Sequence, residues 1–538
     1  MTKSLECALR YLRDEKRVLR VWADGICINQ QDNDEKGRQV QQMGSVYEVA
    51  HHTMIFLGEC EAADEAVLTN ILSCYKRGVI YPERDEGIKA LRQILARPWF
   101  YRIWILQELV ISHDPRVQIG NLRFPWWTLS CLKTLFLLDE AQNKDFDDIG
   151  PKMCFSYPTK GVLGEVSTSL KGGLEVVSQM NNIKWIFEKS RVKSRCAIED
   201  NPTEGPTGWE SETPTEEHDM LLSVLAARRG YQASDPRDRV FAHLGLVNDV
   251  GLKVDYKMTC AQVFQAFAQK HILDTKSYEI FAYVEDVELQ QRMHGVPSWV
   301  PDWTYRKENP RRQQLRYLMR EEEGRLGSGD KPIITNMQRV WKYFSHDVRD
   351  FQASSFSSRA FRLASISKLS EVLDTTAYQR DLDPHRDEYK LNRAGCVWIA
   401  NQLGVDFEVV AYKLFSRVGD SFRTIEFLVQ GLNELGPSVL DARRLAILKE
   451  SLSPVIPTPN DDERTAVVPA SSEPGDHIYF LKGSMVPLVL RRDQKESHAF
   501  RLIGPCLAEG FTIIGNVRKV MDLLMKEDAL GTEIITIY

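Results

Sequence analysis

The chain has 538 residues, 43% of them hydrophobic and 27% charged, which is ordinary for a globular protein of roughly two to four domains. Its net charge of −6 argues against nucleic acid or an anionic membrane as the main partner. The charged N-terminus lacks a signal core, and no apolar run reaches the roughly 18 residues of a membrane span. The ten cysteines form no CxxC pair, so neither a zinc ribbon nor a disulfide framework is indicated, and we expect a cytoplasmic protein.

The first 60 residues predict helices and strands in alternation. Leu5, Leu9 and Leu12 share one helical face within residues 3–15, and residues 34–50 return to the helical period. The stretches 18–24 (VLRVWAD) and 53–57 (TMIFL) are short, apolar and rich in β-forming residues, so each is predicted to be a buried strand. The strand–helix–strand spacing favours an α/β layer with a parallel sheet.

Residues 86–111 predict a second helical region. Proline disfavours helix in the residue before it, so the helix is interrupted at Arg97 and begins again at Pro98, where a missing N–H costs nothing. Trp104, Gln107 and Glu108 are then expected to share one face of the new helix.

Composition divides the rest of the chain. We expect an N-terminal domain at 1–140, a variable region with an acidic, proline-rich linker at 141–218, a mainly helical region at 219–450, a linker at 451–475 and a β-rich segment at 476–538. Asp235 and Pro236 predict a helix start and Gly245 its end, and the aromatic–proline stretch 296–303 is expected to pack onto the body. Short strands are predicted at 478–481, 486–491, 499–502 and 511–514.

Two strings of residues resemble the fungal heterokaryon incompatibility (HET) domain. VWADGICINQQDNDEKGRQVQQMGSVYEVAHHTMIFLGE is similar to the central signature, in which Trp-x-Asp leads into a Cys-Ile-Asn-Gln loop and a helix. RPWFYRIWILQELV is similar to the Arg-x-Trp-Phe-x-Arg-x-Trp-x-x-Gln-Glu box. The matching positions are Trp22, Asp24, Cys27, Ile28, Asn29, Gln30, Glu35, Arg38, Gln39, Met43, Tyr47, Ala50, Leu57, Gly58, Arg97, Trp99, Phe100, Arg102, Trp104, Gln107 and Glu108.

The resemblance implies an α/β fold, because HET domains are distantly similar to TIR domains with their parallel sheet. The family's domain opens with a strand resembling Tyr-x-x-Leu-Ser-Tyr-x-Trp-Gly, whereas this sequence starts in the helix after that strand. We therefore expect a partial, TIR-like HET domain whose sheet lacks its first strand. A mixed, mainly helical region and a β-rich C-terminal segment would follow it.

The resemblance also implies a function in fungal non-self recognition and programmed cell death, exerted through the HET domain and through protein partners. In TIR enzymes, a glutamate of a Trp-containing helix cleaves NAD at the nicotinamide–ribose bond, and Glu108 is the matching position. Three alternatives stay open: an NAD-cleaving hydrolase with NAD as its substrate, a non-enzymatic adaptor that self-associates, and an inert truncated paralogue. No P-loop, GxGxxG, GxSxG or HExxH motif occurs.

Every candidate site residue also has a structural interpretation. Glu108 is a catalytic candidate whose pKa burial would raise, or it pairs with Arg102 at the rim of an aromatic core. Asp24 would line a cleft at a strand end, or it caps its own loop. Cys27 is interpreted as a small packing residue. The further candidates for the cleft are Trp22, Asn29, Gln30, Glu35, Arg38, Trp104 and Gln107, with a capping turn as the alternative for Glu35 and Arg38.

Overall fold

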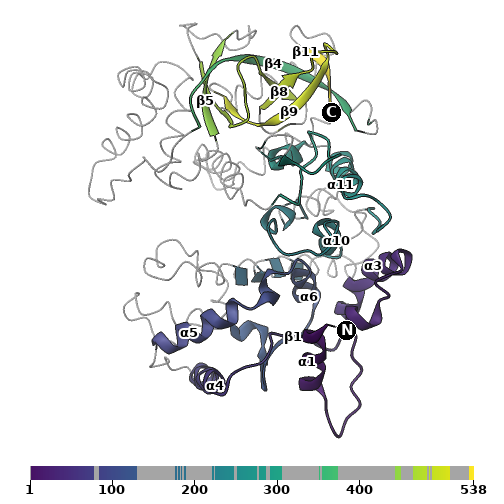
Figure 1. Cartoon of the computed structure of the whole chain (residues 1–538), viewed down its shortest axis with the longest axis vertical. Coiled ribbons are helices and arrows are strands. Elements are labelled where there is room, and N and C mark those ends of the chain that lie inside the picture. The colour runs from purple at the N-terminus through teal and green to yellow at the C-terminus, as the bar shows by residue number, and fades with distance from the viewer. Residues whose placement is uncertain are drawn as a thin grey trace, which may run out of the picture. The chain divides into compact units, whose positions relative to one another are not determined.

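The computed structural model divides the chain into two compact units, Met1–Thr259 and Cys260–Tyr538 (Figure 1). The structure describes residues 2–77, 84–129, parts of 176–188, 221–247, 251–305, 351–372, 443–449, 464–508 and 532–538, with short gaps in several of these ranges. No helix among these residues is both long and apolar enough to cross a bilayer. Each unit is described by itself below.

Two helices that periodicity predicted open the first unit. The helix α1 (Lys3–Leu12) begins after Thr2, whose side chain accepts a hydrogen bond from a backbone N–H of the first turn. The helix α3 (Asn33–Val49) begins after Asp32, whose carboxylate accepts two backbone N–H groups of the first turn. A short helix, α2 (Asp24–Cys27), lies between them. Both predicted helices are therefore confirmed, each with a polar cap at its start.

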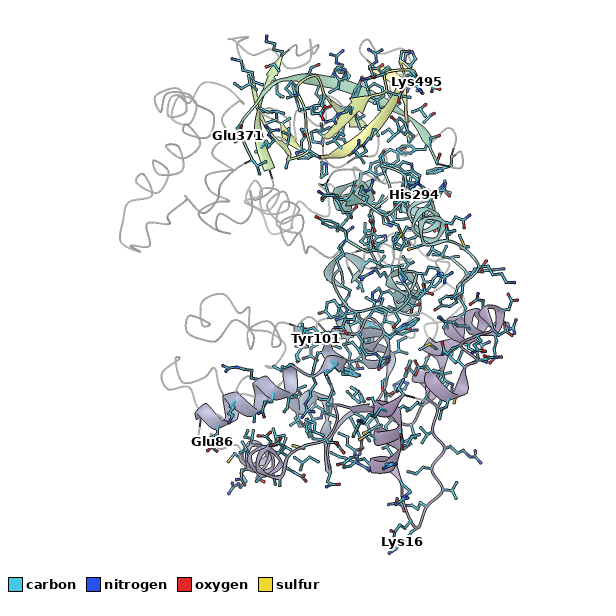
Figure 2. All side chains as sticks on the ribbon, viewed as in Figure 1. Lys16, Glu86, Tyr101, His294, Glu371 and Lys495 are labelled. Atoms are coloured by element: carbon cyan, nitrogen blue, oxygen red, sulfur yellow. The ribbon has the colours of Figure 1, made fainter. Side chains whose placement is uncertain are left out.

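The strand predicted at residues 18–24 is wrong. The segment has no regular structure before α2, and Val18 is 95% exposed. Figure 2 shows Lys16 at the tip of the loop that leads from α1 into this segment. A strand needs a neighbouring strand for its N–H and C=O groups, and none of the described strands pairs with this segment. Cys27, which was expected to pack, is also exposed.

A three-stranded sheet forms the centre of the first unit in the order β1–β2–β3. The strand β1 (Thr53–Phe56), which was predicted, pairs in parallel with β2 (Pro115–Ile119). The chain then turns back, and β3 (Leu122–Pro125) pairs antiparallel with β2. The predicted α/β layer is confirmed, and its parallel part among the described residues is one pair of strands.

Among the described residues between β1 and β2 there are four helices. They are α4 (Ala62–Lys76), α5 (Arg84–Leu95), the 3-10 helix η1 (Pro98–Tyr101) and α6 (Ile105–Ile111). Pro98 begins η1, as predicted. Phe100, Leu106 and Leu109 are fully buried and join one apolar core with Ile55 and Val117 of the sheet. This core fixes the stretch 97–110 against the sheet.

A segment far along the chain completes the first unit. The helix α10 (Asp238–Leu244) packs on α6, and it ends at Gly245, as predicted. Before it, the Ile103 N–H donates to the Gln232 carbonyl at 2.9 Å, and the Gln232 N–H donates to the Tyr101 carbonyl at 2.6 Å. The stretch between η1 and α6 is therefore held by residues more than a hundred positions away.

The second unit begins with α11 (Cys260–Thr275) and the 3-10 helix η5 (Glu279–Tyr283). Trp299 is fully buried, and its ring lies 5.8 Å from that of Phe351 and 5.3 Å from that of Phe356. Trp303 is buried as well. The stretch 296–303 therefore packs onto the body of its unit, as expected.

Among the described residues of the second unit, eight strands form one sheet in the order β10–β6–β5–β4–β11–β9–β8–β7. Because β4 also pairs with β7, the strands from β4 through β11, β9 and β8 to β7 form a closed ring. Figure 1 shows β4, β5, β8, β9 and β11 of this sheet. The strands are β4 (Phe356–Leu369), β5 (Arg443–Lys449), β6 (Arg464–Pro469), β7 (His477–Leu481), β8 (Leu488–Arg492), β9 (Ala499–Pro505), β10 (Leu507–Ala508) and β11 (Thr532–Ile537).

Three of these strands were predicted and three lie where strands were not expected. The strands β7, β8 and β9 confirm the predictions at 478–481, 486–491 and 499–502. By contrast, β4 and β5 lie in the range predicted to be mainly helical, and β6 lies in the range predicted to be a linker. The acidic linker, the helices expected at 386–442 and the strand expected at 511–514 lie outside the described residues.

Candidate functional site

Glu108 lies half-buried on α6 and is the centre of the candidate site. Burial raises the pKa of its carboxyl above the ordinary value. The Arg102 guanidinium opposes this rise, the Asp24 carboxylate adds to it, and a hydrogen bond with the Trp99 side chain opposes it. The balance is a raised pKa, so the fold disfavours the charged form of Glu108 even though a cation lies nearby.

Tyr47 of α3 lies close enough to Glu108 and Asp24 for their charges to act on its phenol. Burial, followed by the charges of these two carboxylates, raises the pKa of the Tyr47 phenol well above its ordinary value. The Trp22 ring meets the Tyr47 ring edge-on, with the ring centroids 5.8 Å apart. The phenol therefore stays protonated at neutral pH and can donate a hydrogen bond. We call Trp22, Asp24, Tyr47, Arg102 and Glu108 the Glu108 cluster.

The loop that leads to α3 is built by its own polar side chains. Asp24 Oδ1 accepts the next backbone N–H at 2.8 Å, and Gln30 Nε2 donates to the Asp24 carbonyl at 3.3 Å. Glu35 Oε1 accepts the Asn29 N–H at 3.1 Å, and the Asn29 side chain accepts a backbone N–H two residues on. Arg38 is exposed on α3. Asn29, Gln30 and Glu35 thus hold the turn that carries Asp24 to the Glu108 cluster.

Trp104 and Gln107 are directed away from Glu108. Trp104 Nε1 donates to Asp238 Oδ2 at 3.1 Å. The Gln107 side chain is buried between Gly44 of α3 and Gly245 at the end of α10, so closely that a Cβ atom at Gly245 would overlap Gln107 Nε2. Trp104 and Gln107 therefore have packing partners outside the Glu108 cluster.

Two members of the Glu108 cluster, Tyr47 and Arg102, were not among the predicted site residues. A signal for both was present, because both are positions at which the sequence matches the HET strings, and Arg102 was considered as a partner of Glu108. The Asp238 contact gave no such signal, because 134 residues separate it from Trp104. The periodicity of hydrophobic residues in a short window cannot predict a contact at that separation.

The Glu108 cluster combines two carboxylates, a phenol and a guanidinium beside an indole ring. Solvent reaches it, because Asp24 and Arg102 are exposed. Carboxyl groups in unlike environments are suited to acid–base work or to stabilising a positive charge that develops during a reaction. Among the described residues, no group of three His, Cys, Asp or Glu side chains is arranged to hold a metal ion.

The fold and the cluster define a two-unit protein whose N-terminal α/β region brings separate motif segments to one polar site. Residues 1–108 match the model of the family described as heterokaryon incompatibility protein (HET), and every member of the Glu108 cluster lies in that range. The N-terminal region of this chain, residues 1–108, is therefore a HET domain.

One curated relative is similar over a longer stretch. It is the heterokaryon incompatibility protein 6, OR allele, of Neurospora crassa, which is 23% identical over 376 residues. The match covers 59% of this chain and 50% of the relative, so the chain spans about half the length of the curated relative it matches. No solved structure matches this chain.

Proposed function

We propose that this protein is an effector of heterokaryon incompatibility that causes growth arrest or cell death after recognition of a non-self signal, and that the Glu108 cluster is its working site. The observation that carries the proposal is the meeting of three separated motif segments at one carboxyl group. The segment of Trp22 and Asp24, the helix of Tyr47 and the box of Arg102 and Glu108 all act on one another there. The similarity to heterokaryon incompatibility protein 6 of Neurospora crassa supports the same biological process.

Recognition, in this proposal, takes place in the cytoplasm through contacts of the region beyond residue 108 with protein partners. The net charge of −6 favours proteins over nucleic acid as partners. The second unit, with its closed sheet and buried aromatic stretch, offers a rigid frame of the kind on which recognition surfaces are usually built.

Inducible expression in a filamentous fungus tests the effector function. The expected result is that the wild-type chain stops colony growth and admits a vital dye, whereas Glu108→Ala does neither. A matched control is Glu86→Ala, because Glu86 is exposed near the start of α5 and is not a member of the cluster (Figure 2). Full arrest by Glu108→Ala at equal protein level would contradict a role for the carboxyl and would favour an adaptor that acts by self-association.

A second candidate function is cleavage of NAD at the nicotinamide–ribose bond, and the composition of the cluster favours it. The Glu108 carboxylate would stabilise the positive charge that develops on the ribose as nicotinamide leaves with the bonding electron pair. Water then adds to the ribose carbon and loses a proton, giving ADP-ribose. Trp22 is half-buried, and an indole ring that is partly open to solvent can contact a base.

Incubation of the purified chain with NAD tests this candidate. Nicotinamide release should be lost in Glu108→Ala and retained in Glu86→Ala. Because the reaction needs the charged carboxylate and the pKa of Glu108 is raised, release should decline with falling pH at a higher pH than an ordinary glutamate would give. No release by wild-type protein, or equal release by Glu108→Ala, would rule the reaction out.

A further inference from the structure

We propose that a clamp made by Asp238, Gly245, Val254, Tyr256 and Lys257 sets the spacing of α3 and α6, and that Asp238 is thereby a positioning residue for the Glu108 cluster. All five residues lie beyond the range that matches the HET family model. The role of Asp238 rests on the proposed function of the cluster, whereas labelling of the Glu108 carboxyl can be measured without cell death or NAD cleavage.

The clamp holds α6 at two points one turn apart. Asp238 Oδ2 accepts the Trp104 indole N–H at 3.1 Å. Gly245 presses on the buried Gln107 side chain, where no Cβ atom fits. Glu108 follows Gln107 directly, so a displacement of Gln107 moves the backbone that carries the carboxyl. These contacts fix the first turn of α6, directly before Glu108.

The same clamp holds α3. The Val254 N–H donates to Gln41 Oε1 at 2.9 Å, and the Val254 carbonyl lies so close to Gly37 that a Cβ atom there would approach it to 2.8 Å. Lys36 Nζ lies 3.9 Å from the centre of the Tyr256 ring, and Lys257 pairs with Asp34. The helix that carries Tyr47 is therefore gripped along its first half.

A buried hydrogen bond joins the contacts with α3 to the contacts with α6. Tyr256 donates its hydroxyl to Asp238 Oδ1 at 2.7 Å, while Trp104 occupies the other oxygen of the same carboxyl. Asp238 is nearly inaccessible to solvent, and burial raises the pKa of its carboxyl, whereas the two hydrogen bonds lower it. One carboxyl thus links the segment that grips α3 to the first residue before α6, and α3 packs directly on α6.

The groups that act on Glu108 come from both gripped elements and from the loop between α1 and α3. Tyr47 belongs to α3, Arg102 and Trp99 belong to the stretch before α6, and Asp24 belongs to the loop. Burial is the largest influence on the pKa of Glu108, and α3 packs directly on α6, the helix that carries this residue. A weaker clamp therefore admits water beside Glu108 and brings its titration closer to that of an ordinary glutamate.

Site-specific labelling of the full chain tests the proposal. A hydrophobic carbodiimide reacts with protonated carboxyl groups, and peptide mass spectrometry measures labelling of Glu108 across a pH series. In Tyr256→Phe and in Asp238→Asn, the labelling midpoint should fall by about half a pH unit or more, which is about a threefold loss of labelling at fixed pH. Asp114→Asn is the matched control, because Asp114 pairs with Arg116 on the surface of the same unit.

The melting temperature of each variant separates positioning from stability. Tyr256→Phe keeps the ring that Lys36 contacts and removes one hydrogen bond, so it is the variant expected to remain folded if Asp238→Asn does not. A folded Tyr256→Phe variant whose Glu108 labelling follows the wild-type curve would overturn the proposal. If neither the wild type nor any variant causes cell death, but the labelling midpoint of Glu108 still shifts in the variants, only the proposed function is refuted.

Discussion

The buried charges of residues 285–304 in the second unit and the charges of the Glu108 cluster in the first unit have opposite surroundings. In the second unit, Asp302 accepts the Met293 N–H at 2.7 Å and the Thr304 N–H at 2.9 Å. Arg292 lies 3.6 Å from Glu285 and donates to backbone carbonyls of the stretch 297–300. Every one of these charges is buried and is matched by groups held in place by the fold.

In the Glu108 cluster, charge is left poorly matched. Asp24 and Arg102 are exposed, and the balance of forces on Glu108 raises the pKa of its carboxyl. A buried network of matched charges is expensive to break but has no capacity left for a ligand. A half-buried carboxyl that the fold does not neutralise contributes little to folding and remains available for chemistry. The buried charges of residues 285–304 therefore stabilise the fold, whereas those of the Glu108 cluster remain available to a ligand.

The largest expected effect is on the buried network. Arg292→Ala leaves Glu285 buried without its cation, so we expect a loss of about 3–5 kcal/mol in the free energy of unfolding of the second unit. Denaturant unfolding of the full chain measures it. Arg116→Ala, at an ion pair whose side chains are 50% and 38% exposed, is the control, and it should cost about 0–1 kcal/mol. Equal losses in the two variants would remove the contrast.

A smaller effect is expected where α10 meets α6. Gly245→Ala places a methyl group in the volume of the buried Gln107 amide and should cost about 1–3 kcal/mol in the free energy of unfolding. Adding Gln107→Ala should restore part of that loss, because it empties the contested volume. Thermal unfolding of the two single variants and the double variant measures the coupling. Strictly additive losses would show that the contact does not strain the fold.

The smallest effect, and one of opposite sign, is expected at Glu108. Its folded-state pKa is raised, so ionisation opposes folding: the contribution is favourable below the unfolded pKa and is lost as pH rises through the folded pKa. Glu108→Gln should therefore raise the melting temperature at neutral pH and should leave it unchanged in acid, where the carboxyl is protonated in both states. A lower melting temperature at neutral pH would place Glu108 among the structural charges.

The sequence anticipated those parts of the fold that local patterns determine. Helices α1 and α3 have a clear apolar period and polar caps, and Pro98 marks the start of η1. The stretch 18–24 has the composition of a strand, yet composition supplies no partner strand, and the segment is exposed. The long strand β4 was missed for a related reason, because its burial pattern follows from pairing with distant strands on both edges.

The site was anticipated in the same partial way. Glu108 and Asp24 were selected from the motif strings, and they act on one another in the structure. Trp104 and Gln107 were assigned to the same face, but their partners, Asp238 and Gly245, lie far along the chain and draw them away. Helical spacing predicts which residues can meet on one helix, but not which of them a distant segment will engage.

The closed sheet of the second unit has a kinetic consequence. The strand β11 lies between β4 and β9, and its Thr536 shares a hydrogen bond of 3.0 Å with Ser357, which is 179 residues away. Closing a loop of that length costs conformational entropy before the strand pairing contributes any favourable free energy. Folds dominated by such long-range pairings therefore form slowly. Until residues 532–537 arrive, one edge of β4 has no partner over its first half. At that stage the unpaired edge of β4 is open to pairing with another chain, so the second unit is prone to aggregation until β11 is in place.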